Sequence, residues 1–275
     1  MPTPPTPDRP QGKPTRGKTA RNRLRRSDIF ISRYAPNLIK APSPPDQTAW
    51  FVDLGYGRQP FTTIESAQRL RKLNPTLPVL GVEIDPERVQ AAQVYQDEHT
   101  QFRLGGFNLP FAANETARIV RAFNVLRQYE EDQVHDSLLT LADHVQLGGL
   151  ILEGTSDPYG RLWVANLLRK TESEPLQLEG LIFSTNFRWG FEPSIFQPVL
   201  PKNLIHRMMP GEPIHTFFAA WEQAANQTIA YKEFGLRQWF VAAAQALAEY
   251  GYPIDLRKKM LKTGFLVWNT PSPLT

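Results

Sequence analysis

Short apolar runs alternate with helical patterns between residues 49 and 155. The run AWFVDLG (49–55) is closed by a glycine, as expected for a buried parallel strand. Similar runs follow at 77–85, 100–106, 117–126 and 150–154. Strands that alternate with helices predict βαβ units, and therefore an α/β fold whose largely parallel sheet is covered on both faces.

The helix signals lie between these runs. Thr62 and Glu65 have the spacing of a capping box, and Asp85 followed by Pro86 is a strong helix start. An apolar stripe at helical spacing precedes residues 148–149, a glycine pair that we expect to end that helix.

Beyond residue 155 the pattern is weaker. It predicts helices near 160–170, 214–227 and 234–250, and strands near 179–184 and 264–268. The order of the last strands stays open. We divide the chain into a tail (1–20), an N-terminal helix and linker (21–48) and one domain (49–275), which has a core (49–185) and a helical C-terminal elaboration (186–275).

Positive charge is concentrated at the N-terminus. Residues 1–26 carry eight basic residues and one acidic one, whereas the other 249 residues carry 23 basic and 26 acidic ones. Residues 1–20 contain almost nothing apolar, which predicts disorder. The arm could bind RNA or another polyanion, although it contains no aromatic residue before Phe30 for base stacking; a solubilising tail is the alternative.

Several classes are excluded or disfavoured by composition. The chain has no cysteine, which excludes disulfides, thiolate nucleophiles and cysteine-ligated metals. It shows neither a secretory signal nor a membrane-spanning apolar run, and no histidine pattern suggests a metal site. We therefore expect a cytoplasmic protein without a resident metal or membrane partner.

The ends of the first two strands carry candidate binding chemistry. Gly55 and Gly57 would let the backbone approach a ligand closely. A dinucleotide fingerprint would need glycine or alanine at position 60, which is Pro60, and the acid Asp53 precedes the loop. Both features disfavour a diphosphate and fit a ligand with a positive charge. Glu83 can accept hydrogen bonds from both hydroxyls of a ribose, since Asp85 already caps the following helix.

The motifs VDLGYG, GVEID, RLGGFNLPF, RAFNVL and LGGLILEG, taken in order, resemble those of class I S-adenosylmethionine-dependent methyltransferases over about residues 50–155. The resemblance implies a Rossmann-like three-layer sandwich with a mostly parallel seven-stranded sheet, the last strand antiparallel, and S-adenosylmethionine as cofactor. It implies cofactor contacts from Asp53, Gly55, Tyr56, Gly57, Glu83, Ile84, Gly106, Phe107, Phe123 and Asn124.

The chain departs from the family pattern at two points. Gln59 replaces the third glycine of the loop, and no acid follows the third strand. The amino group of adenine would then need Asn108 or a backbone carbonyl as its acceptor. A degenerate, non-catalytic fold that binds nucleic acid therefore stays open, as does, less favoured, a nicotinamide-dependent oxidoreductase.

The methyl acceptor is not identified by the sequence. Candidate catalytic residues after the fourth strand are Asn124, Arg127 and Tyr129, and candidates after the fifth are Glu153, Ser156, Asp157 and Tyr159. The cofactor would carry the reactive methyl group, so the protein needs mainly to align the acceptor. The sequence lacks the proline pair of adenine amino-methylases and the cysteine of base C5-methylases.

Overall fold

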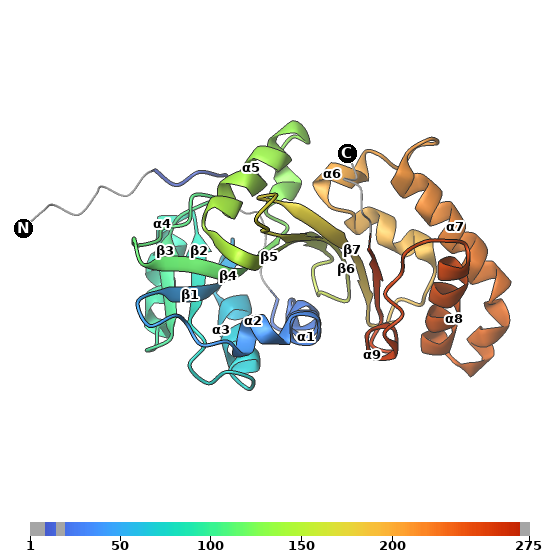
Figure 1. Ribbon diagram of the computed structural model, residues 1–275, viewed down its shortest axis with the longest axis horizontal. Coiled ribbons are helices and arrows are strands. Elements are labelled where there is room, and N and C mark those ends of the chain that lie inside the picture. Colours follow the sequence, from blue (N-terminus) through green and yellow to red (C-terminus); the bar gives the residue numbers. More distant parts are fainter. Residues whose placement is uncertain (1–8, 15–19, 270–275) are drawn as a thin grey trace, which may run out of the picture.

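The computed structural model describes residues 9–14 and 20–269 (Figure 1). The strands are β1 (Thr48–Leu54), β2 (Val79–Glu83), β3 (Thr100–Leu104), β4 (Glu115–Phe123), β5 (Val145–Ser156), β6 (Leu162–Arg169), β7 (Gln177–Thr185) and β8 (Phe265–Trp268). The α-helices are α1 (Arg25–Tyr34), α2 (Pro36–Lys40), α3 (Phe61–Leu70), α4 (Pro86–Ala92), α5 (Asp132–Asp143), α6 (Lys202–Ile205), α7 (Pro213–Gln227), α8 (Leu236–Glu249) and α9 (Lys258–Leu261). Short 3-10 helices are η1 (Gln93–Tyr95), η2 (Leu126–Gln128), η3 (Pro193–Val199) and η4 (Ile229–Phe234).

In the described part of the chain, all eight strands form one sheet in the order β3-β2-β1-β4-β5-β6-β7-β8. The pairings among β1 to β5 are parallel, whereas β5–β6, β6–β7 and β7–β8 are antiparallel pairings. The predicted α/β fold with a mostly parallel core is confirmed. The prediction of seven strands with a single antiparallel one is corrected to eight strands, two of which, β6 and β8, run opposite to the other six.

The expected helix near 160–170 is wrong, because this segment is strand β6. A tight turn follows β5, in which the Asp157 carboxylate accepts the backbone N–H groups of Arg161 and Leu162 at 2.6 and 3.2 Å. The chain then reverses and pairs with β5. Both faces of β6 are buried, so its sequence lacks the alternation that marks a half-exposed strand.

Two other local expectations are corrected. Helix α5 ends at Asp143, and residues 148–149 lie inside β5, where the β4–β5 register shifts. Helix α3 begins at Phe61 without a capping hydrogen bond from a side chain. Thr62 instead donates its hydroxyl to Asp53, at 2.7 Å.

Helices cover both faces of the sheet. Buried side chains of α1, α2, α3 and α9 form one cluster against β1, β4 and β6, and α5 packs a second cluster on the opposite face. Helices α7 and α8 build a third, aromatic cluster against β6, β7 and β8. Figure 1 shows these two helices beyond β7, away from the parallel strands.

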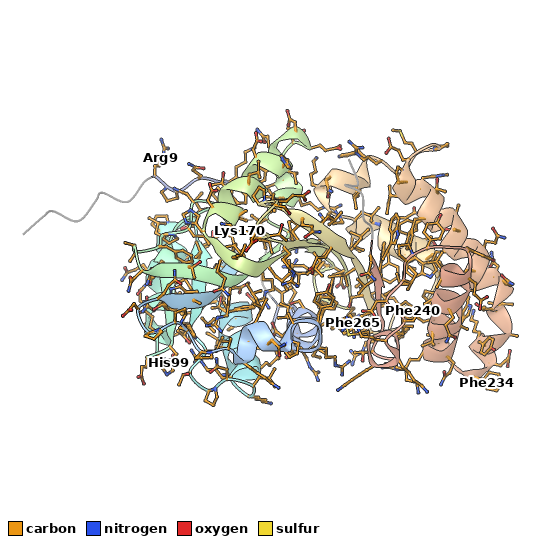
Figure 2. The ribbon with its side chains drawn as sticks, viewed as in Figure 1. Arg9, His99, Lys170, Phe234, Phe240 and Phe265 are labelled. Atoms are coloured by element: carbon orange, nitrogen blue, oxygen red, sulfur yellow. The ribbon has the colours of Figure 1, made fainter. Side chains whose placement is uncertain are left out.

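Most of the tail predicted to be disordered, residues 1–8 and 15–19, lies outside the described residues. The described segment 9–14 runs to the parallel half of the sheet, where Figure 2 labels Arg9. Within the described ranges, no helix has both the length and the hydropathy needed to cross a bilayer.

Candidate functional site

The loop after β1 is shaped by two glycines and one carboxylate. Gly55 and Gly57 have φ angles of +69° and +82°, in the left-handed region that favours glycine. The Glu83 carboxylate, at the end of β2, accepts the Gly57 N–H at 2.8 Å. The G-x-G bend therefore lies directly against the end of the neighbouring strand.

Glu83 is 1% exposed. Its other oxygen accepts the backbone N–H of Ile84 at 3.0 Å, and the Arg88 guanidinium lies 3.6 Å away. Asp85 caps α4 as predicted, accepting the backbone N–H groups of Glu87 and Arg88.

These groups border what we call the carboxyl-edge cleft, at the carboxyl ends of the parallel strands, where open α/β sheets bind ligands. Its walls include Leu54, Glu83, Ile84, Phe107, Val125 and Tyr129. The segment 11–13 also lies in it, which leaves a cavity of about 20 Å³. That space holds about one water molecule.

The backbone of Gln11 forms hydrogen bonds with two residues that follow β3, Phe107 and Asn108. The Phe107 N–H donates to the Gln11 carbonyl at 2.9 Å, and the Gln11 N–H donates to Asn108 Oδ1 at 2.7 Å. The approach is close, since a Cβ added to Gly106 would meet the Gln11 carbonyl oxygen at 1.9 Å. Next along the segment, the Lys13 N–H donates to the Tyr129 hydroxyl. This contact could not be expected from the sequence, because the tail has no apolar pattern.

The expected cofactor residues divide into two groups. Those that line the cleft are Gly55, Glu83, Ile84, Gly106 and Phe107, whereas Asp53, Tyr56, Gly57, Phe123 and Asn124 are not among its walls. Gly57 contacts Glu83 directly. Tyr56 is buried against Phe102 and α4, and Phe123 packs on Trp163 on the α1 side of the sheet.

Asp53 belongs to a buried charge network that the sequence analysis did not anticipate. Arg121 of β4 lies 2.9 Å from Asp53 and 2.5 Å from Asp28 of α1. Thr62 and Thr63 donate their hydroxyls to the other Asp53 oxygen. Burial alone would lower the pKa of Arg121, but the two carboxylates raise it, so the guanidinium stays charged. The sequence feature that indicates this network is Arg121 itself, a charged residue in the middle of an apolar strand.

The three candidate catalytic residues are not brought together. Asn124 joins the ends of β4 and β5 through two hydrogen bonds with Ser156, at 3.0 and 3.3 Å. Arg127 donates to the Pro198 carbonyl at 2.9 Å and so fastens η2 to η3. Only Tyr129 lines the cleft, and burial raises the pKa of its hydroxyl.

The candidates after β5 also differ in their surroundings. Glu153 is fully buried, which raises the pKa of its carboxyl group to about 7, and it accepts a hydrogen bond from Asn166. Asp157 is buried in the β5–β6 turn, where it accepts backbone N–H groups. Tyr159 is exposed on the same turn.

Comparison with known proteins gives weak likenesses. No family model and no curated protein matches the chain. Among solved structures, the citrinin polyketide synthase CMeT domain aligns at 13% identity over 50% of this chain and 36% of that chain, with a TM-score of 0.39. LepI in complex with SAM aligns at 19% identity over 44% of this chain and 30% of that chain, with a TM-score of 0.34.

A further similar structure is SAM-bound CalS10, an amino pentose methyltransferase from Micromonospora echinaspora. It aligns at 14% identity over 61% of this chain and 68% of that chain, with a TM-score of 0.34. The chain spans about a third of the length of the first two structures. At such identities and TM-scores the likeness bears on neither activity nor substrate. The parallel order β3-β2-β1-β4-β5 itself makes the fold Rossmann-like.

Proposed function

We propose that the protein is a methyltransferase that uses S-adenosylmethionine, with the adenosine in the carboxyl-edge cleft. The observation that carries the proposal is the pairing of Glu83 with the Gly55–Gly57 bend, beside the Phe107 N–H and Asn108 Oδ1. A ribose needs acceptors for its hydroxyls, and adenine needs one donor and one acceptor side by side. Glu83 offers the first kind of partner, and the Phe107 N–H and Asn108 Oδ1 offer the second.

The contacts of Gln11 support the adenine position. An amide N–H and C=O of one extended residue present a donor and an acceptor on the same side. The amino group of adenine and its neighbouring ring nitrogen present the same pair. The Phe107 N–H and Asn108 Oδ1, which pair with Gln11 in this structure, could therefore pair with adenine in the same way. Adenosine fits only when residues 11–13 leave the cleft, since about 20 Å³ remains beside them.

The loop between β1 and α3 suits a diphosphate poorly. A buried carboxylate, Glu83, faces the bend, and Pro60 lacks the N–H that would help to hold a phosphate at the start of α3. These features support S-adenosylmethionine rather than a nicotinamide dinucleotide.

In this proposal the bound cofactor supplies the activated methyl group. The residues of the chain bind and orient. Glu83 holds the ribose, Phe107 and Asn108 hold the adenine, and Tyr129 packs beside Phe107 with ring centroids 5.5 Å apart. Asn124 acts by fixing the ends of β4 and β5 relative to each other. The acceptor would then be aligned beyond these strand ends.

The test is calorimetric titration of S-adenosylhomocysteine into the wild-type protein, Glu83→Gln and Glu87→Gln. Glu87 lies four residues further on, is exposed, and gives the same change in charge. We expect binding to the wild type and to Glu87→Gln, and binding at least about tenfold weaker to Glu83→Gln, since each charge-assisted hydrogen bond contributes about 1.5–3 kcal/mol.

Two outcomes would overturn the proposal. One is the absence of heat with S-adenosylhomocysteine both in the full chain and in protein lacking residues 1–14. The other is equal affinity in Glu83→Gln and the wild type. NAD titrated in parallel should give no heat, and heat with NAD alone would support the oxidoreductase alternative.

A further inference from the structure

A second cavity lies where the N-terminal arm crosses the β5–β6 turn. Its volume is about 400 Å³, and we call it the arginine cavity. Its lining includes five arginines: Arg21, Arg25, Arg26, Arg161 and Arg188. None of the described residues that line it is acidic. Such a concentration of guanidinium groups in a concave site favours an anionic ligand.

The charge of these arginines is not neutralised by the described parts of the protein. Across residues 9–14 and 20–269, none of the five forms an ion pair within 4.0 Å. Burial, together with the positive charges of the nearby Arg237, Arg33 and Arg25, lowers the pKa of Arg26 to about 9. Asp157 of the same turn is buried and accepts the backbone N–H groups of Arg161 and Leu162, and its charge acts on Arg23 of the arm.

The cavity is held in shape by close contacts between the arm and the sheet. Arg26 donates to the Ser184 hydroxyl at 2.8 Å and to the Thr263 carbonyl at 2.9 Å. Gly160 has a φ of +64°, and a Cβ at this position would lie 1.6 Å from the Arg23 carbonyl oxygen. The turn can approach the arm this closely only because it has a glycine there.

Two exposed aromatic rings flank the cavity. Tyr159, which lines it, is 59% exposed, and Trp189 is 52% exposed. The Arg161 guanidinium lies 4.8 Å from the Tyr159 ring centroid and 5.8 Å from that of Trp189. Exposed aromatic faces beside guanidinium groups are the surface on which a nucleobase stacks.

We propose that the arginine cavity binds a nucleotide, with its phosphate among the guanidinium groups and its base against Tyr159 and Trp189. Phosphate oxygens match the donor geometry of arginine, and stacking uses the exposed ring faces. The same chemistry is offered by a free mononucleotide and by a single strand of RNA.

The cavity lies next to the strand ends that border the proposed transfer site. Arg23 of the arm donates to the Ser156 hydroxyl at 3.1 Å, and Asn124 donates to the same hydroxyl. A nucleotide held here would be the methyl acceptor, and that role, unlike the binding itself, rests on the proposed function. Phosphate binding is therefore tested without reference to methyl transfer.

The probes are uridine monophosphate, uridine and a ten-residue oligouridylate, titrated calorimetrically at 50 and 150 mM NaCl. Excess S-adenosylhomocysteine is present, so that the carboxyl-edge cleft does not take up the nucleoside. We expect uridine monophosphate to bind at least about tenfold more tightly than uridine, because the phosphate supplies the charged contacts. Equal affinity of the two would overturn the proposal.

The variant is Arg25→Gln/Arg188→Gln, and its control is Lys40→Gln/Lys72→Gln. All four side chains are exposed, so folding should be unaffected, and both variants lose two positive charges. We expect the arginine variant to bind uridine monophosphate about tenfold or more weakly and the lysine variant to bind as the wild type does. An equal loss of affinity for uridine monophosphate in both variants would overturn the proposal, because it would show an effect of net charge alone.

The oligouridylate distinguishes the two sources of the ligand. Tighter binding than the monophosphate, with a steeper salt dependence that Arg25→Gln/Arg188→Gln reduces, supports the cavity and identifies a single strand as the ligand. Affinity equal to that of the monophosphate supports the cavity and identifies a free nucleotide. Should S-adenosylhomocysteine fail to bind in its own titration, the proposed function fails while the result with uridine monophosphate stands.

Discussion

The two halves of the sheet are built in different ways. Beneath the parallel half, Arg121 is buried between Asp28 and Asp53, so that a charge network connects α1, β1 and β4. In the antiparallel half, Phe183 packs against Phe217 with ring centroids 5.3 Å apart, within a cluster of aromatic side chains from η3, α7 and α8. Figure 2 labels Phe240, a member of this cluster.

The two halves therefore differ in what their buried side chains do: the aromatic cluster stabilises the fold, whereas the charge network positions a loop. Aromatic burial contributes free energy without fixing any one loop. A buried ion pair contributes little net stability, because desolvation offsets its attraction, but it is costly to break. The network reaches Thr62 and Thr63 at the start of α3, next to the loop that carries Gly55 and Gly57. We infer that it fixes the geometry of that loop.

The largest expected effect is that of Arg121→Met. Loss of the guanidinium leaves Asp28 and Asp53 buried without their shared cation, which should lower the free energy of unfolding by about 3–5 kcal/mol. Urea unfolding measures this change. The double variant Asp28→Asn/Arg121→Met should recover part of the loss, because one buried charge is removed. A loss below about 1 kcal/mol for the single variant would show that the network matters little to folding.

A second effect lies on the boundary of the two halves, where Glu153 of β5 faces Asn166 of β6. Burial raises the pKa of Glu153 from 4.5 to about 7, so the folded protein keeps a proton that the unfolded chain releases. Stability should therefore fall as the pH rises from about 4.5 to 7 and then level off. Glu153→Gln should remove the fall, and so be about 3 kcal/mol more stable than the wild type at pH 8.

Thermal or urea unfolding at pH 4 and pH 8 checks this effect of Glu153. At pH 4 the two proteins should be nearly equal, since the carboxyl group is neutral in both states. A constant difference at both pH values would assign the effect to packing or hydrogen bonding, and not to ionisation.

A smaller change is expected in the antiparallel half. Phe183→Leu should lower the free energy of unfolding by about 1–2 kcal/mol through lost burial and ring contacts. The affinity for S-adenosylhomocysteine should stay as in the wild type, because the aromatic cluster does not reach the carboxyl-edge cleft. A parallel fall in affinity would contradict the separation of the two halves.

The parallel half could be predicted from the sequence better than the antiparallel half. Its strands are short apolar runs that end in Gly55 and Glu83, and βαβ order constrains the way they pair. The strand β6 could not be identified, because a strand buried on both faces has no alternation and resembles an apolar helix. Its pairing depends on the turn at Asp157, whose role is visible only once the chain reverses.

In the candidate site, too, some residues could be predicted from the sequence and others could not. Glu83 and Gly55 both line the cleft, and Gly57 donates to Glu83, because strand ends in a parallel sheet converge at one edge. Asp53 was expected at the ligand but belongs to the charge network, since its partners Arg121 and Asp28 are far from it in sequence. Local patterns carry no information on such long-range pairs.

A comparably small effect concerns residues 9–14, which lie in the cleft of the parallel half. Because Gln11 holds the Phe107 N–H and Asn108 Oδ1, it must be displaced before adenine can bind there. Each hydrogen bond contributes about 1 kcal/mol net, so removal of the segment should raise the affinity for S-adenosylhomocysteine about fivefold to thirtyfold. Calorimetry on protein lacking residues 1–14 measures this gain.

A point variant of Gln11 separates the backbone contact from the length of the tail. Gln11→Pro removes the N–H that Asn108 accepts and should give a severalfold gain in affinity, whereas Gln11→Ala keeps both backbone groups and should bind S-adenosylhomocysteine as the wild type does. Weaker binding after the deletion or in Gln11→Pro would reverse the interpretation, because the segment would then be a lid that holds the cofactor in place. The sign of one measured change in affinity therefore decides whether the N-terminal segment competes with adenosine or covers it.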